Sequence, residues 1–242
     1  ARKSEIAKLK EQAAFRREFL GNLAHELKTP VFSIQGYILT LLEGGLEDEK
    51  VNRKFLERAA FSAERMTEIL EDLDQIMKLE VNKVEIKKEA FDIVDLTKDL
   101  ILSFEERCLE KEVTLKLAER YEPIYVNADK AKIAQVITNL IANSLNYSIE
   151  KGKTTIRFYT VNSTLMTEVS DNGIGIDEKN IPRLFERFYR VEQSRNRNEG
   201  GSGLGLAICK HIIESHNETI AVKSKIGVGS TFSFTLKKSN KH

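Results

Sequence analysis

The sequence has few of the residues that mark disulfide-rich, metal-binding or membrane-spanning proteins. It contains no tryptophan, three prolines and two cysteines, and the cysteines, Cys108 and Cys209, lie far apart inside helical patterns. Such a pair predicts two buried thiols in a reducing compartment, without a disulfide scaffold or a cysteine metal site. No apolar run approaches the roughly 18 residues that a membrane-spanning helix needs, and there is no signal peptide. The formal net charge of +1 gives no electrostatic reason to expect nucleic acid or an anionic membrane as a partner.

The composition favours a globular protein with two domains. Of 242 residues, 41% are hydrophobic and 31% are charged, which is enough chain and enough apolar surface for two modest cores. We predict a first domain over residues 1–82 and a second over residues 83–242. The helical pattern is already under way at Ala1, so we expect the parent protein to continue upstream. This part would then be cytoplasmic, and the parent would be anchored in the inner or plasma membrane.

Two long amphipathic helices are predicted in the first domain. Their apolar positions recur at alternating spacings of four and three residues, the seam pattern of a coiled coil or an antiparallel bundle. The seam positions are Leu9, Ala13, Arg16, Leu20, Leu23, Leu27, Pro30, Ile34, Tyr37 and Leu41 in one helix, and Phe55, Ala59, Ser62, Met66, Ile69, Leu73 and Ile76 in the other. The polar turn Glu43–Lys50, with two glycines, joins them into a hairpin.

A second apolar row widens the face of the second helix beyond what two helices can cover. It comprises Leu56, Ala63, Leu70 and Met77. The simplest way to bury this row is to pair two hairpins into a four-helix bundle. The pattern therefore predicts a homodimer.

Strand-like and helical stretches mix in the second domain. Strands are predicted at 113–117, 124–126, 154–161, 165–170, 219–224 and 231–236, and helices at 93–110, 129–146 and 203–215. The last strands follow one another as hairpins. We therefore expect an α+β two-layer sandwich with its helices on one face of the sheet.

His25 lies two residues from each of the seam residues Leu23 and Leu27. Two residues turn a helix by about 200°, so the imidazole should point into solvent. An exposed neutral imidazole is a competent nucleophile, although an exposed histidine is more often an ordinary surface residue. Pro30 removes the backbone hydrogen bond to Glu26, which predicts a bend beside the histidine.

Four segments of the second domain suggest a nucleotide site. Asn139, Asn143 and Asn146 form an amide stripe on one side of a helix, and an amide oxygen suits one position of a Mg²⁺ shell. Asp171–Ile176 (DNGIGI) is a glycine-bearing turn after a strand. Leu184–Arg190 (LFERFYR) precedes a polar stretch with the character of a lid. Gly201–Leu206 (GSGLGL) opens a helix and is suited to cradle phosphate. Taken singly, each could be a solvated face, a turn, a loop or a helix cap.

In their order and spacing these segments resemble a known family. His25-Glu-Leu-Lys-Thr-Pro30 matches the phosphoacceptor box of bacterial sensor histidine kinases, H-E-L-(K/R)-T-P, without departure. The four segments of the second domain resemble the N, G1, F and G2 boxes of the ATP-binding domain that these kinases share with gyrase, MutL and a heat-shock chaperone ATPase. The string Phe32–Ile38 is similar to phosphate-regulon-type sensors.

The resemblance implies a fold, a reaction and partners. The fold would be a helical-hairpin dimerisation domain followed by an α+β sandwich of the gyrase and histidine-kinase type. The chain would use ATP and Mg²⁺ to phosphorylate His25. The phosphoryl group would then pass to an aspartate in the receiver domain of a response regulator, and the chain would also dephosphorylate that regulator.

Roles for single residues follow from the same resemblance. Glu26 would accept the second ring N–H of His25, and Thr29 would position water for dephosphorylation. Asn143 would bind Mg²⁺ with support from Asn139. The remaining ATP-binding positions would recognise adenine (Asp171), shape its pocket (Gly173, Gly175), flank the phosphates (Tyr147), anchor the lid (Phe185, Phe188), orient the γ-phosphate (Arg187) and bring the backbone to the triphosphate (Gly201, Ser202, Gly203, Leu204, Gly205).

Two positions depart from the family pattern. Asn146, in the ATP-binding set, stands where the family often has Lys or Arg. The lost charge-assisted contact would weaken ATP binding by about 1–2 kcal/mol unless another cation substitutes. Asn217 replaces a glycine after the last helix, and Asn tolerates the left-handed conformation needed there.

Three rival functions share parts of this pattern. An ATP-driven machine of the gyrase or chaperone type would have no use for the box around His25. A catalytically silent dimeric scaffold would not need Asn143, Asp171 or the glycines. A protein that works mainly as a phosphatase would use all the same residues, so the balance of the two activities stays open, as does transfer within or between subunits.

Overall fold

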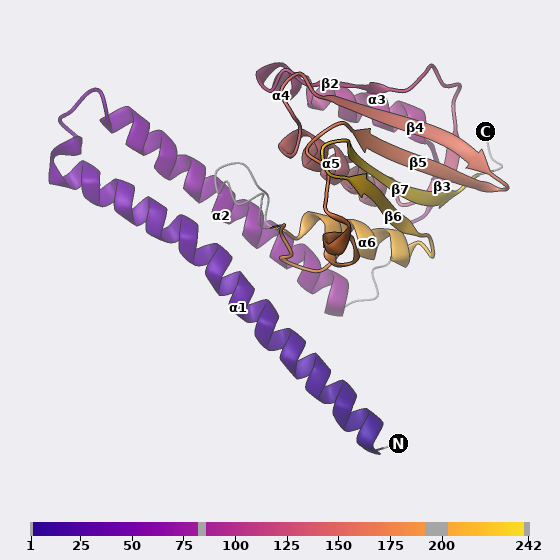
Figure 1. The fold of residues 1–242 in the computed structure, drawn as a ribbon, viewed down its shortest axis with the longest axis horizontal. Coiled ribbons are helices and arrows are strands. Elements are labelled where there is room, and N and C mark those ends of the chain that lie inside the picture. The colour runs from indigo at the N-terminus through magenta and orange to yellow at the C-terminus, as the bar shows by residue number, and fades with distance from the viewer. Residues whose placement is uncertain (1, 82–85, 192–202, 240–242) are drawn as a thin grey trace. The chain divides into compact units, whose positions relative to one another are not determined.

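The computed structural model describes residues 2–81, 86–191 and 203–239, which form two compact units (Figure 1). The units are residues 1–77, here called the hairpin unit, and residues 78–242, here called the sandwich unit. The domain boundary predicted at 82/83 falls among residues 82–85, outside the described residues, and stays a prediction. Among the described helices, none combines the length and the apolar character that crossing a membrane would require.

The hairpin unit consists of two antiparallel helices. Helix α1 spans Arg2–Thr40 and α2 spans Asn52–Val81, and one π-helical turn, η1 (Leu41–Gly45), ends the first helix. Gly44 takes φ +112°, a conformation that residues with a Cβ rarely adopt, and this reverses the chain. The predicted hairpin is therefore confirmed. Helix α1 continues through Pro30 as a single helix, so the bend predicted there stays a prediction.

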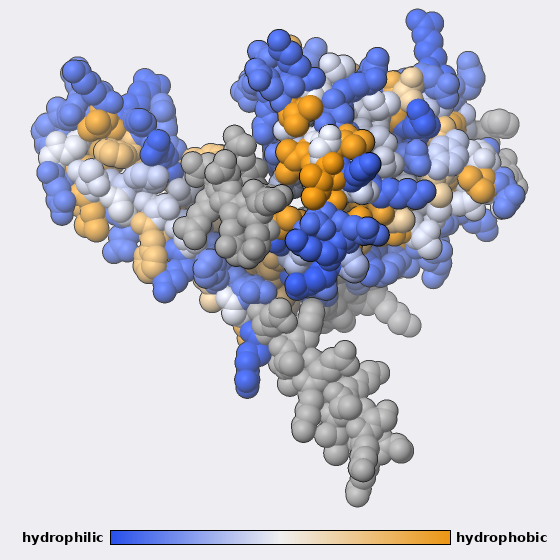
Figure 2. Space-filling model, viewed as in Figure 1, coloured by the Kyte–Doolittle hydropathy of each residue, from blue (hydrophilic) through white to orange (hydrophobic). Residues whose placement is uncertain are grey.

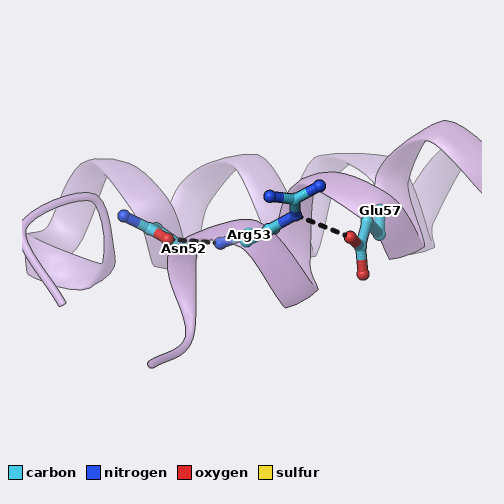
Figure 3. Close-up of polar contacts among 3 residues, drawn as sticks. All are labelled: Asn52, Arg53 and Glu57. Atoms are coloured by element: carbon cyan, nitrogen blue, oxygen red, sulfur yellow. Dashed lines mark hydrogen bonds and ion pairs between the residues drawn. The ribbon is translucent and has the colours of Figure 1, made fainter. Parts of the chain in front are cut away.

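Local contacts fix both ends of the turn. The rings of Tyr37 and Phe55 stack with their centroids 5.8 Å apart, which ties α1 to α2. At the start of α2 the Oδ1 of Asn52 accepts the backbone N–H of Arg53, and Arg53 Nε lies 3.1 Å from Glu57 Oε1 one turn later (Figure 3). The ring stack joins the two helices next to the turn, whereas the contacts of Arg53 stabilise the first turn of α2.

Much of the apolar surface of the hairpin unit remains exposed. Ile69 and Leu41 are buried, whereas three of the four residues of the second row, Leu56, Leu70 and Met77, are among the exposed large hydrophobic residues. Other members of that set are Leu20, Val31, Phe32, Ile38, Leu39, Leu42, Leu46 and Phe61. Figure 2 shows apolar side chains on the surface around the hairpin turn. One copy of the hairpin thus leaves a long apolar face in water.

The sandwich unit is built on a mixed five-stranded sheet. Its strands are β2 (Thr114–Leu117), β4 (Lys153–Val161), β5 (Thr164–Asp171), β6 (Ile220–Lys225) and β7 (Gly229–Lys237). The order is β2-β4-β5-β7-β6, in which β2 runs parallel to β4 and the other pairs are antiparallel. Strands β1 (Glu89–Asp92) and β3 (Tyr125–Ala128) form a separate antiparallel pair.

Three helices cover one face of this sheet: α3 (Ile93–Ser103), α5 (Lys130–Asn146) and α6 (Gly205–Ser215) (Figure 1). Strands β4, β5 and β7 alternate between buried residues and residues that are half-buried or exposed, as strands with one covered face do. The buried side of α5 comprises Ile133, Val136, Ile137, Leu140, Ile141, Ser144 and Leu145. The two-layer α+β sandwich predicted from the sequence is confirmed.

Details of this unit differ from the prediction. The helix expected over 93–110 is interrupted at Phe104, where the backbone takes φ −98° and ψ 3°, and continues as α4 (Glu105–Glu110). Strand β1 and the 3₁₀ helix η2 (Glu178–Arg183) were not predicted. Asn217 has φ +62°, the left-handed conformation expected where it replaces glycine. Cys209 is buried and Cys108 half-buried, and both are free thiols.

Candidate active site

His25 lies on the exposed side of α1, as its position between seam residues predicted. Both neighbours in the seam, Leu23 and Leu27, are half-buried, so the helix turns its apolar side inward and its imidazole outward. A nucleophile that must meet a bulky phosphate donor needs this accessibility. The hairpin thus presents His25 to solvent on a rigid helix.

The two neighbours of His25 with predicted roles make contacts of their own. Glu26 Oε2 lies 3.8 Å from Arg65 Nη2 on α2, and both side chains are only about one-fifth exposed (22% and 18%). In this arrangement the carboxylate faces α2, and its predicted contact with the His25 ring requires another rotamer. Thr29 Oγ1 donates to the backbone oxygen of His25 at 3.3 Å. Thr29 therefore lies one turn beyond the histidine with its hydroxyl directed back toward it.

In the sandwich unit the amide stripe of α5 runs between two other elements. Asn139 Nδ2 donates to the backbone oxygen of Gly205 at 3.3 Å, at the start of α6. Asn146 Oδ1 accepts from Arg107 Nη2 of α4 at 2.7 Å. Asn143 lies between them and is half-buried. The stripe thus connects the N-terminus of α6, where backbone N–H groups favour anions, to an arginine at its other end.

Asp171 ends β5 and is held by two backbone donors. Its Oδ1 accepts from Gly173 N at 2.8 Å and from Ser230 N at 3.2 Å. Burial raises the pKa of this carboxyl above its ordinary value of 3.8, and the two backbone hydrogen bonds oppose that rise. Within the described part of the chain no hydrogen bond uses Oδ2, which is therefore the oxygen that can accept from a ligand.

The glycines around Asp171 are dictated by close backbone contacts. A Cβ on Gly173 would lie 2.3 Å from the backbone oxygen of Tyr147, and one on Gly175 would lie 2.0 Å from that of Lys225. Gly175 also has φ +70°. Tyr147 follows α5 directly, and its oxygen accepts the N–H of Ile174 at 3.1 Å. The loop after β5 is thus clamped between the end of α5 and the β6–β7 turn.

The predicted lid, the polar stretch 192–200, lies outside the described residues, and the segments on either side of it meet through the backbone. Phe188 N donates to the oxygen of Gly203 at 2.9 Å, and Phe188 and Gly203 have φ of +60° and +76°. Leu204 is fully buried, and Phe185 and Arg187 are half-buried. A Cβ on Gly205 would meet Asn139 only at 3.7 Å, an ordinary contact. Gly201 and Ser202 lie outside the described residues.

The described side chains at this site can supply part of the coordination shell of Mg²⁺. Among the described residues no group of three or more His, Cys, Asp or Glu side chains could hold a metal ion. In the same part of the chain Asn143 makes no side-chain hydrogen bond, so its amide oxygen is available as a ligand. Mg²⁺ is commonly held by one or two protein oxygens together with substrate phosphates and water. The residues therefore fit an ion that arrives with a nucleotide.

Sequence reasoning missed three contributors to this site. Arg107 reaches the amide stripe from a helix 39 residues earlier in the chain. Ser230 supplies the second backbone donor to Asp171, and Gly229 allows it to do so, because a Cβ there would lie 2.0 Å from the Asp171 oxygen. The only sign of these contacts in the sequence was the pair of glycines in the β6–β7 turn. Such a pair predicts a turn, but it does not predict which residues the turn contacts.

Comparison with known proteins matches both units. Residues 15–82 match the family described as "His Kinase A (phospho-acceptor) domain", and residues 128–240 match "Histidine kinase-, DNA gyrase B-, and HSP90-like ATPase". The chain belongs to the sensor histidine kinases. Its membership of this ATPase family assigns ATP as the ligand of the sandwich unit.

Two curated relatives of this histidine kinase illustrate the match. Sensor histidine kinase WalK of Bacillus subtilis (strain 168) is 37% identical over 225 residues, which are 91% of this chain and 36% of the relative. Sensor protein kinase WalK of Staphylococcus aureus is 36% identical over 225 residues, 91% of this chain and 53% of the relative. The chain thus spans between about a third and a half of these relatives' length. The predicted likeness to phosphate-regulon-type sensors stays a prediction.

Solved structures show the same arrangement of elements. Acinetobacter baumannii histidine kinase AdeS is 26% identical with a TM-score of 0.70, and the match covers 89% of this chain and 98% of that one. Histidine kinase ThkA, solved in complex with response regulator protein TrrA, has a TM-score of 0.77 at 23% identity, covering 98% of this chain and 66% of that one. At that identity the second match shows the fold alone.

Proposed function

We propose that this histidine kinase transfers the γ-phosphoryl group of ATP to its own His25 and then to an aspartate of a response-regulator receiver domain. The observation that carries the proposal is the joint presence of two parts in one chain. One is an exposed imidazole on a helical hairpin, and the other is a sandwich unit with a half-buried carboxylate, Asp171, and an amide stripe that contacts the N-terminus of α6. A protein that used only one of these two parts would have no need for the other.

In the first step a ring nitrogen of neutral His25 attacks the γ-phosphorus. The N–P bond forms as the bond from γ-phosphorus to the bridging oxygen breaks, and ADP leaves with that electron pair. The imidazolium so formed gives up the proton on its other nitrogen, and Glu26 is the adjacent carboxylate that accepts it. For this Glu26 must leave Arg65, which lies 3.8 Å away, and because both side chains are mostly buried the separation costs free energy.

The sandwich unit would orient the nucleotide for that attack. Asp171 accepts the exocyclic amine of adenine through Oδ2, in a pocket bounded by Gly173 and Gly175. Asn143, supported by Asn139, would hold Mg²⁺, which offsets charge on the transferring phosphates when it is bound. Backbone N–H groups at Gly203–Gly205 would face the phosphates. Tyr147 would flank them and Arg187 would orient the γ-phosphate, while Phe185 and Phe188 would anchor the lid.

The exposed apolar face of the hairpin supports a homodimer. Leu56, Leu70 and Met77 repeat at the spacing of a bundle seam and are exposed in the single chain. A second hairpin would bury this row and complete four helices. The parent protein would carry its sensor and its membrane anchor upstream of this part.

Dephosphorylation of the regulator is a second activity that the same face supports. The hydroxyl of Thr29 lies one turn beyond His25 and is directed toward it. Once the phosphoryl group has left His25, this hydroxyl would turn from the backbone oxygen of His25 to orient a water molecule near that face. The proposal gives Thr29 a role in this reaction and none in the attack on ATP.

A two-stage label transfer tests the proposal. The chain is incubated with γ-labelled ATP and Mg²⁺, freed of nucleotide, and then mixed with a receiver domain or with the same domain in which the acceptor aspartate is Asn. We expect the label to leave the kinase and appear on the unmodified receiver alone. A labelled chain that gives nothing to a panel of receivers would refute the transfer step, and an unlabelled chain would refute the whole proposal.

A further inference from the structure

Arg107 is a cation that the chain brings to the amide stripe from outside it. It lies on α4, is half-buried, and donates from Nη2 to Asn146 Oδ1 at 2.7 Å. The two residues are 39 positions apart in sequence, so the contact exists only in the folded unit. A hydrogen bond of this length with a charged donor is among the strong ones.

The stripe to which Arg107 is attached faces a region that attracts anions. Asn139, at its other end, contacts the first residue of α6, whose N-terminal N–H groups favour negative charge. The stripe itself is made of neutral amides, yet a triphosphate carries more negative charge than one Mg²⁺ neutralises. Arg187 is assigned to the γ-phosphate, so the Asn146 end of the stripe still lacks the protein cation that commonly completes a phosphate site.

We propose that Arg107 is this cation: it contacts the triphosphate of ATP from the Asn146 end of the stripe and replaces the basic residue that position 146 lacks. The proposal rests on the proposed function, since it assumes that ATP occupies the sandwich unit. A guanidinium has five N–H donors in a planar fork, and the bond to Asn146 uses one of them. The others remain to bind phosphate oxygens, and the Asn146 bond holds the fork in place before ATP arrives.

A merely structural role for the same contact predicts different behaviour. A tie between α4 and the last residue of α5 would stabilise the fold and affect all ligands of the pocket alike. A phosphate contact would affect ATP and leave adenosine, which has no phosphate, unchanged. It would also be replaceable by a cation placed directly at position 146.

The test measures the affinity of the whole chain for ATP and for adenosine by calorimetry. It compares wild type with Arg107→Gln and with the double variant Arg107→Gln, Asn146→Lys. The control is Arg120→Gln, at an exposed loop position. We expect Arg107→Gln to weaken ATP binding on the order of tenfold and to change adenosine binding less than about twofold. Adding Asn146→Lys should restore most of the lost ATP affinity, and Arg120→Gln should match wild type. Melting temperatures confirm that each variant is folded.

Three outcomes would overturn the inference. ATP affinity within about twofold of wild type in Arg107→Gln would show that no phosphate contact exists. An equal loss for ATP and adenosine, or no rescue by Asn146→Lys, would assign the contact to structure alone. Wild-type protein that binds adenosine but not ATP would refute the proposed function itself, which the other two outcomes leave intact.

Discussion

Two glycines assigned to the ATP site, Gly175 and Gly205, should respond differently to the same substitution by alanine. A Cβ at Gly175 would lie 2.0 Å from the oxygen of Lys225 and 2.6 Å from its carbonyl carbon, and φ there is +70°. Placing alanine in the left-handed region costs about 1–2 kcal/mol, and forcing apart a packed contact costs about 1–3 kcal/mol more. The neighbouring backbone resists the shift because Gly227 N donates to the oxygen of Ile174 at 2.8 Å.

The sum, about 2–5 kcal/mol, converts to a fall in melting temperature of roughly 5–20 °C for a unit of this size. Gly205→Ala meets nothing closer than Asn139 at 3.7 Å and lies at the first residue of a helix, a backbone conformation that alanine adopts without strain, which favours alanine by about 0.4–1 kcal/mol. Its melting temperature should therefore stay level or rise. Because the added methyl points at the amide stripe, its ATP affinity should fall nonetheless.

Calorimetric unfolding of both variants, with ATP titrations at a temperature where each is folded, checks this difference. The sandwich unit should unfold at a lower temperature than wild type in Gly175→Ala and at the wild-type temperature or above it in Gly205→Ala. Equal losses of stability in the two variants would refute the steric argument. A Gly175→Ala protein as stable as wild type would show that the loop after β5 is not clamped as described.

Three further predictions concern other contacts. Because burial raises the pKa of Asp171, its ionisation opposes folding: its contribution to stability is full below pH 3.8 and is lost as the pH rises through the folded pKa. The variant Asp171→Asn keeps both backbone hydrogen bonds through Oδ1, so its melting temperature should rise relative to wild type as pH rises through that range. It should also bind ATP roughly 10- to 100-fold more weakly. A gain in melting temperature that is largest at acid pH would contradict this. His216 is buried between Asp129 N, 3.0 Å from its Nε2, and the Ile212 oxygen, 2.8 Å from its Nδ1. His216→Phe should destabilise the sandwich unit by about 1–3 kcal/mol in urea unfolding, since it leaves the Asp129 N–H without this acceptor, and an unchanged midpoint would be the contrary result. Thr29→Ala should autophosphorylate within about twofold of wild type, because within the described ranges the Thr29 hydroxyl bonds a helix carbonyl and no other group, yet it should dephosphorylate the regulator slowly. A matched loss of both rates would place Thr29 in the kinase step.

The sequence predicted the elements whose residues repeat with a regular period. The seam of the hairpin was predicted because burial on one side of a helix leaves a period of about 3.6 in the apolar positions, although Leu20, one of the predicted seam residues, is exposed. The interruption at Phe104 left no such mark, since one residue of different backbone conformation does not disturb the spacing of its neighbours. Strand β1, with four residues and charges at both ends, was too short to show alternation.

The site was predictable where its residues follow one another and not where the fold brings them together. The boxes containing His25, Asn143 and Asp171 are contiguous strings. Gly229 and Arg107 act through contacts with Asp171 and Asn146 that no local pattern contains. The pairing of Glu26 with Arg65 is of the same kind: it depends on the register of two helices set by the turn between them.

The claim that His25 is the phosphoacceptor is tested most directly by labelling the chain with γ-labelled ATP and Mg²⁺ beside two variants, His25→Gln and Asn143→Ala. The account predicts a label on wild type that is lost in acid and kept in alkali, as a phosphohistidine is, and no label on either variant. Label retained by His25→Gln, or ATP hydrolysed by wild type with no protein label, would contradict it.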